Sequence, residues 1–135
     1  MTVDKEALIS RIQAAQAELT GLLEGMDYCL DWKPEPQEWC AREVVYHLLT
    51  TPPGGLPAVL RDMLQDNLPE LTIVAGETNV TPERQEKELE QVRADIDALF
   101  QGLLEAVSSA SAERLEEART TAYFPHRDER EERSA

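Results

Sequence analysis

Residues 39–48, with the sequence Trp-Cys-Ala-Arg-Glu-Val-Val-Tyr-His-Leu, contain the side chains of this chain that are best suited to chemistry. Glu43 lies three residues after Cys40, the spacing at which a glutamate accepts a hydrogen bond at a helix N-terminus. His47 lies three residues after Val44, so its imidazole should face the edge of a core. Such an imidazole can bind a metal or make a structural hydrogen bond. Taken alone, this pattern favours the structural role.

The two cysteines are a second candidate for chemistry. Cys29 and Cys40 have neither CxxC nor zinc-ribbon spacing, so we expect two reduced thiols rather than a disulfide. A cluster of both thiols with His47 is an alternative, but two small apolar side chains are the simpler interpretation. The sequence has no glycine-rich phosphate loop, nucleophile elbow or EF-hand spacing that would indicate another kind of site.

Helices must position these residues, because apolar side chains recur every three or four residues over much of the chain. Pro34 and Pro36 exclude a helix from the connection before residue 39, and Trp32 and Trp39 should anchor that connection to the core. Residues 66–81 are expected to form a loop, and no sheet is expected. The pattern predicts long helices over residues 3–25 and 82–108, and shorter ones over residues 39–50, 56–65 and 112–119.

The sequence predicts one all-α domain, an up-down helical bundle with a short or missing last helix. A chain of 135 residues fits a single domain. We expect residues 1–125 to form the bundle and residues 126–135 to form a charged tail, because residues 127–133 contain no apolar side chain. The predicted helices do not complete a bundle of four comparable helices. We therefore expect a homodimer that covers the remaining apolar surface.

The charge balance excludes several classes of partner. The chain has 13 basic and 27 acidic residues and a formal net charge of -14, and such a surface repels nucleic acid and anionic membranes. No segment approaches the roughly 20 apolar residues of a membrane-spanning helix. The N-terminal residues lack the basic start and the apolar stretch of a signal peptide. We expect a cytoplasmic protein with no nucleic-acid partner and no membrane partner.

Three segments together resemble the DinB-like superfamily. They are Leu22-Leu23-Glu24-Gly25, Leu30-Asp31-Trp32-Lys33-Pro34, and Trp39-x-x-x-Glu43-Val44-x-x-His47-Leu48. The resemblance covers residues 8–65 well and the rest of the chain by its helix pattern. It implies a four-helix bundle with a divalent metal, zinc or nickel, held by three histidines. In several members it implies a transferase, in which the metal activates a thiol such as bacillithiol or mycothiol.

Only part of that metal site can be carried over to this chain. His47 matches the first ligand, which ends the second helix. The other two ligands stand as His-x-x-x-His on the last helix, but the one remaining histidine, His126, is followed at that spacing by Arg130. Cys40 replaces the usual serine at the helix start, and Pro52 stands where an acidic residue often follows. His47 and His126 are therefore the candidate metal ligands.

From this resemblance we expect a DinB-like protein that lacks the complete three-histidine site. It would act as a binding or interaction protein, with no cofactor and with a small molecule as a candidate ligand. The alternative is a thiol transferase or hydrolase that depends on zinc or nickel. Its site would be completed by His126, by a carboxylate such as Glu129, or by a second subunit. A homodimeric scaffold is a third interpretation, and the sequence leaves open whether the chain is an enzyme.

Overall fold

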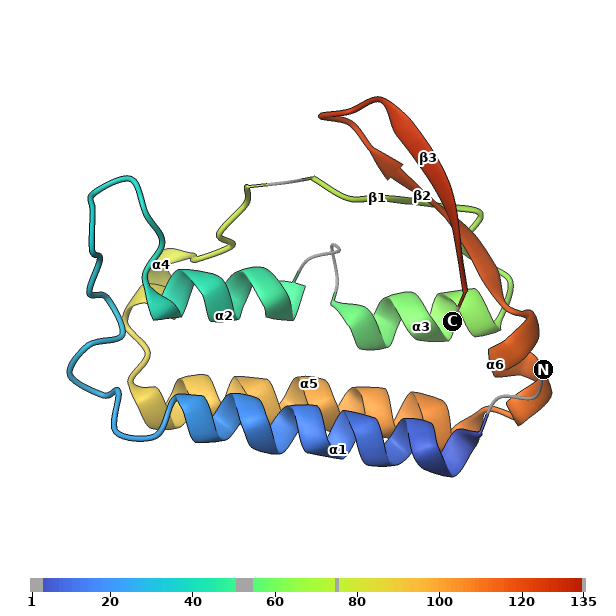
Figure 1. Ribbon diagram of the computed structural model, residues 1–135, viewed down its shortest axis with the longest axis horizontal. Helices are drawn as coiled ribbons and strands as arrows, with labels where there is room; N and C mark the ends of the chain where they lie inside the picture. The colour runs from blue at the N-terminus through green and yellow to red at the C-terminus, as the bar shows by residue number, and fades with distance from the viewer. Residues whose placement is uncertain (1–3, 51–54, 75, 135) are drawn as a thin grey trace.

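The computed structural model describes residues 4–50, 55–74 and 76–134, and these residues form six helices and three strands (Figure 1). The helices are α1 (Lys5–Leu22), α2 (Ala41–Thr50), α3 (Leu56–Leu64), α4 (Pro82–Gln85), α5 (Leu89–Ser109) and α6 (Ala112–Glu117). The strands are β1 (Glu70–Thr72), β2 (Arg119–Phe124) and β3 (Glu129–Ser134). No helix in these described ranges is long and apolar enough to cross a membrane.

The helices form a bundle around α5. Helix α1 lies along α5 in the opposite direction, while α2 and α3 follow one another along a different side of α5 (Figure 1). Residues 65–81 return along the molecule before α4 begins, so α5 runs in the same direction as α2 and α3 (Figure 1). The predicted helices are present, except that the single helix expected over residues 82–108 is divided into α4 and α5, because Glu88 caps a new helix start. Their order is not a strict up-down alternation.

The main core lies between α2, α5 and the connection that precedes α2. Leu30 in that connection is 3% exposed, whereas Trp32 is 66% exposed, so the prediction that Trp32 is an anchor was wrong. Trp39, the other expected anchor, is half-buried. Helix α1 has no buried residue and contributes half-buried apolar side chains such as Ile12 and Leu19. The buried residues of this core are Leu23, Leu30, Val45, Tyr46, Leu49, Val92, Ile96 and Phe100.

A small sheet corrects the prediction of an all-α chain. Its strand order is β1-β2-β3, with β1 parallel and β3 antiparallel to β2. Thr120 and Ala122 of β2 are buried, and the Thr120 hydroxyl donates to the Leu68 carbonyl at 2.7 Å. The spacing of apolar residues could not reveal β1, because its partner strand β2 lies about fifty residues further along the chain.

The predicted charged tail contributes strand β3. This strand has no apolar residue, and ion pairs replace apolar contacts with its neighbours. Arg130 lies 3.1 Å from the Glu70 carboxylate of β1, and Arg119 of β2 lies 3.8 Å from the Glu132 carboxylate. The division between residues 1–125 and 126–135 stays a prediction, and the β2–β3 hairpin spans it.

A buried arginine ties the connection before α2 to the segment between α4 and α5. Arg42 is 4% exposed. Its Nε and Nη2 donate to the two Asp31 carboxylate oxygens at 2.8 and 3.2 Å. Its Nη1 donates to the backbone carbonyls of Arg84 and Lys87 at 2.8 and 2.6 Å. A buried guanidinium needs such partners, because burying a charge without hydrogen bonds is costly.

We predict that Arg42→Met lowers the free energy of unfolding by about 3 kcal/mol, because the two backbone carbonyls lose a charged donor. The measurement is urea denaturation followed by circular dichroism. Arg93→Met, at an exposed position of α5, is the control and should change stability little. An equal effect of the two substitutions would contradict a special role for Arg42.

Candidate functional site

The start of α2 is built as the sequence predicted. The backbone N–H of Cys40 donates to Glu43 Oε1 at 3.2 Å, which confirms the expected helix-start contact. Lys33 Nζ lies 2.9 Å from the same carboxylate oxygen. These contacts join the Pro-rich connection to the first turn of α2. They fix the rotation of the helix that presents His47.

His47 is half-buried on α2, at the edge of the core. Its Nδ1 lies 2.6 Å from the Glu77 carbonyl oxygen, and its ring meets Trp39 edge-on with centroids 5.0 Å apart. A carbonyl can only accept, so Nδ1 carries the proton of the neutral imidazole and Nε2 carries the lone pair. Metal-bound histidines are commonly oriented in this way, so the geometry of His47 alone suits a ligand.

His126, the second candidate ligand, lies in the turn between β2 and β3. It is exposed, and its ring lies edge-on to Phe124 with centroids 6.2 Å apart. Glu129, a candidate carboxylate, lies 3.6 Å from Arg127. The segment expected to carry the family's histidine pair is thus a hairpin rather than a helix.

The donors that the structure describes do not fit a three-imidazole metal site. The whole sequence has two histidines. Within the described ranges no group of three or more His, Cys, Asp and Glu side chains is placed to hold a metal ion. Pro52, which replaces an acidic residue of the motif, lies outside those ranges. Of the two candidate ligands, His47 is the one whose described geometry suits a metal, and its role as a ligand stays a prediction.

The cysteines are free thiols without the features of a nucleophile. Burial raises the pKa of the Cys40 thiol above its ordinary value, so the thiol stays protonated at neutral pH. Cys29 Sγ donates to the Met26 carbonyl at 3.7 Å. This geometry agrees with the interpretation of both cysteines as small apolar side chains.

A polar network around Tyr46, one helical turn after Arg42, joins α2 to α5. Tyr46 is fully buried, and its hydroxyl donates to Asp95 Oδ2 at 2.5 Å. Lys87 Nζ donates to the same oxygen at 2.8 Å, and the Arg84 guanidinium lies 4.7 Å from the centre of the Tyr46 ring. Burial, and then the bond to Asp95, raises the pKa of Tyr46. A phenol held neutral and enclosed in this way is structural.

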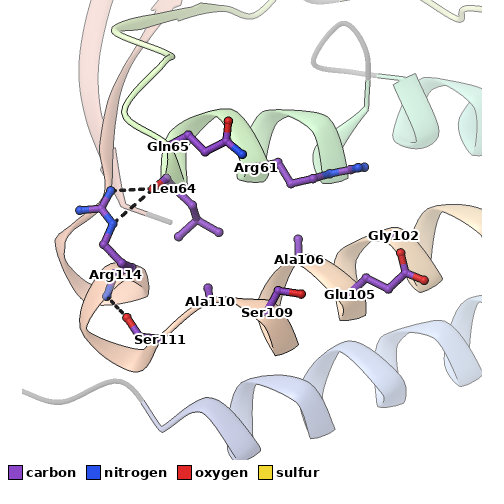
Figure 2. A pocket seen from close by; sticks show the side chains of 10 residues that line it. All are labelled: Arg61, Leu64, Gln65, Gly102, Glu105, Ala106, Ser109, Ala110, Ser111 and Arg114. Carbon is purple, nitrogen blue, oxygen red and sulfur yellow. Dashed lines mark hydrogen bonds between the residues drawn. The ribbon is translucent and has the colours of Figure 1, made fainter.

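A cavity of about 450 Å³ lies between α3, α5 and α6, at the other end of α5 from α2's first turn (Figure 2). Small side chains on α5 leave this space open below α3, with Gly102 and Ala106 one helical turn apart. The residues that line the cavity are Arg61, Leu64, Gln65, Gly102, Glu105, Ala106, Ser109, Ala110, Ser111 and Arg114.

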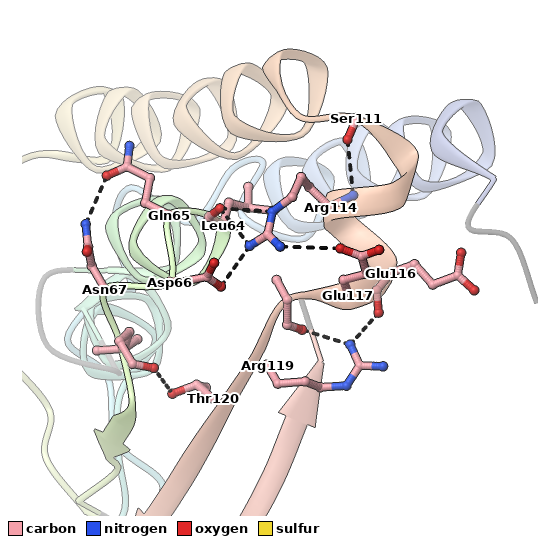
Figure 3. A network of polar contacts seen from close by, with 12 residues as sticks. Leu64, Gln65, Asp66, Asn67, Ser111, Arg114, Glu116, Glu117, Arg119 and Thr120 are labelled. Carbon is pink, nitrogen blue, oxygen red and sulfur yellow. Dashed lines mark hydrogen bonds and ion pairs between the residues drawn. The ribbon is translucent and has the colours of Figure 1, made fainter.

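Arg114 forms a fixed end wall of the cavity (Figures 2 and 3). Its Nε and Nη2 donate to the Leu64 carbonyl at 3.3 and 2.9 Å. Its charge is balanced by Asp66 at 2.9 Å and by Glu117 at 3.6 Å. Because these partners occupy the guanidinium, Arg114 shapes the cavity and links α6 to α3 rather than supplying an available charge.

Arg61 and Glu105 are the charged side chains of the cavity that such pairs do not neutralise. Arg61 Nε donates to the Pro57 carbonyl at 3.2 Å, and no carboxylate among the described residues lies within ion-pair distance of its guanidinium. Its Nη2 lies 4.0 Å from the point where a Cβ on Gly102 would stand. Glu105 is exposed and accepts a hydrogen bond from Gln101 at 3.2 Å.

Sequence reasoning missed this cavity and the burial of Arg42. The Gly102-x-x-x-Ala106 spacing was the available signal, because small residues one turn apart let another helix approach closely. The close approach is real, since a Cβ on Gly102 would stand 3.0 Å from Pro57 Cβ. The position of α6, which closes the cavity, had no comparable signal.

The comparisons with known proteins agree with the motif. The model of the DinB superfamily matches residues 11–134 of the chain. No curated protein and no solved structure matches the chain.

The Asp95 network predicts a pH dependence of stability. Although burial raises the pKa of Asp95, the hydrogen bonds from Lys87 and Tyr46 outweigh it, and the net pKa lies below the ordinary 3.8. A lowered folded-state pKa adds stability above the unfolded-state value, and this stability is lost as the pH falls through the folded-state value. We therefore expect the stability difference between wild type and Asp95→Asn to be largest above about pH 5 and to shrink below about pH 4.

The measurement is urea denaturation at a series of pH values. Glu90→Gln, an exposed carboxylate on the same helix, is the control, and its stability difference should stay small throughout. A difference for Asp95→Asn that does not change with pH would contradict the assigned network.

Proposed function

The chain belongs to the DinB superfamily, and on that frame we propose that it is a binding protein whose ligand site is the cavity between α3, α5 and α6. The observation that carries the proposal is Arg61, an exposed guanidinium that lines the cavity and has no carboxylate partner among the described residues. A volume of about 450 Å³ falls within the range of roughly 300–1,000 Å³ that small-molecule sites occupy.

The ligand class follows from the charges around the cavity. Arg61 can pair with a carboxylate, and Glu105 can pair with an ammonium group. Leu64 and the buried Ala106 offer an apolar surface between α3 and α5. The net charge of -14 repels a ligand with net negative charge but not one without net charge. We infer a small zwitterion, such as a free amino acid with an apolar side chain.

The family's thiol-transferase chemistry is the alternative function. The contact between His47 Nδ1 and the Glu77 carbonyl favours it, because metal-bound histidines commonly make such a contact with their other ring nitrogen. The alternative requires further ligands from His126, a carboxylate or a second subunit. We place it second because no group of three or more His, Cys, Asp and Glu side chains within the described ranges could hold a metal ion.

We predict that L-leucine binds with a dissociation constant of about 1 mM or below, a modest value that suits so small a ligand. Isothermal titration calorimetry measures this constant. Isocaproate lacks the ammonium group and isoamylamine lacks the carboxylate, so each should bind at least about tenfold more weakly. Arg61→Gln should weaken leucine binding by a similar factor, because it removes a charged hydrogen bond.

Arg93→Gln is the matched control, since Arg93 is an exposed arginine of α5 that does not line the cavity. It should leave the leucine affinity unchanged. Undetectable binding of leucine to the wild-type protein would overturn the zwitterion proposal. Equal binding of leucine and isoamylamine would exclude the role assigned to Arg61.

A further inference from the structure

Strand β3 is an open edge of the sheet. It pairs with β2 on one side, and no strand among the described residues pairs with its other side. The hairpin that it forms with β2 extends above the helices (Figure 1). Most of the residues of this strand with a described side chain are exposed. Such an edge presents unpaired backbone N–H and C=O groups, which an added strand can satisfy.

Charged side chains often protect an edge strand from pairing, so the charge pattern of β3 decides whether it can pair. Its sequence is Glu-Arg-Glu-Glu-Arg-Ser, which mixes both signs along the strand. An edge of one sign would repel its own copy in every register. This mixed pattern instead makes repulsion or attraction depend on the register.

We propose that β3 pairs with β3 of a second copy of this chain, antiparallel and about a two-fold axis, with Glu131 opposite its own equivalent. In this register Glu129 stands opposite the second copy's Arg133, and Arg130 stands opposite the second copy's Glu132. The symmetry repeats both pairs, so four opposite-charge pairs flank one like-charge pair. Directly opposed side chains on neighbouring strands interact most strongly, so this arrangement is attractive.

Neighbouring two-fold registers are less favourable. In an antiparallel pair with the axis perpendicular to the sheet, one residue must face its own copy. If that residue is Arg130 or Arg133, two guanidiniums oppose each other. If it is Glu132, the only opposite-charge pairs join Glu131 to the second copy's Arg133. The register centred on Glu131 therefore has the best charge complementarity of the set.

The charged side chains of β3 also form ion pairs within one chain, and these pairs are exposed. Arg130 pairs with Glu70 on β1, and Arg119 on β2 pairs with Glu132. Arg133 pairs with Glu131 on its own strand, so it can also screen the like-charge pair at the axis. Because exposed ion pairs contribute little, these contacts within the chain can give way to pairs across the interface.

This interface is independent of the cavity and of its ligand. It gives the expected homodimer a surface, a symmetry and a register. Because the surface is polar, the dimer should be sensitive to salt, which screens exposed ion pairs.

The test is sedimentation velocity of the full chain over micromolar concentrations, at about 20 mM and about 500 mM salt, where the screening lengths differ several-fold. We expect a dimer at low salt whose dissociation constant rises at least about tenfold at high salt. Arg133→Glu should weaken the dimer at least about tenfold, because two attractive pairs become repulsive. The double variant Glu129→Arg/Arg133→Glu reverses the sign of both members of each pair and should restore the dimer.

Arg93→Glu makes the same change of net charge on α5, away from the sheet, and should leave the dimer intact. A monomeric wild-type chain at low salt would overturn the proposal. A dimer that Arg133→Glu does not weaken would also overturn it and would point to a helical face as the interface. Failure of the double variant to restore the dimer, with circular dichroism unchanged, would exclude this register.

Discussion

The buried guanidinium of Arg42 is the constraint on which the α2 end of the bundle depends. It joins Asp31 in the connection before α2 to the backbone carbonyls of Arg84, in α4, and of Lys87, between α4 and α5. Because a buried guanidinium requires its hydrogen bonds, these three segments must meet at one place. That meeting orients α2, sets Tyr46 against Asp95, and presents His47 to the Glu77 carbonyl.

The helices and the position of His47 could be predicted from sequence, because apolar spacing and the helix-start pair Cys40–Glu43 are local signals. The sheet could not. Strand β3 has no apolar residue, and β1 finds its parallel partner only after the chain has passed through α5. The burial of Arg42 was also invisible, since a charged residue in a helix pattern indicates solvent. The cavity depends on how α3, α5 and α6 approach one another, which no single segment encodes.

The chain belongs to the DinB superfamily, but its C-terminal segment does not supply the expected pair of histidines. The resemblance implies that the second and third ligands belong to a last helix, whereas residues 119–134 of this chain form a hairpin rich in charge. Val59 and Met63 of α3 pack with Ala118, which directly precedes β2. Helix α1 has no fully buried residue. At the same end of α5, between α3 and α6, lies the cavity whose small floor residues leave Arg61 and Glu105 available to a ligand.

The proposed ligand site is the cavity between α3, α5 and α6, and not His47. Two-dimensional nitrogen–proton NMR spectra of the labelled chain, titrated separately with L-leucine and with zinc, test it most directly. The account predicts that leucine shifts the amide signals of Gly102, Ala106 and Ala110. It also predicts that one equivalent of zinc leaves the signals of His47 and Glu77 in place. Zinc-dependent shifts at His47 and Glu77, together with no response to leucine, would contradict the account and favour the metal chemistry of the family.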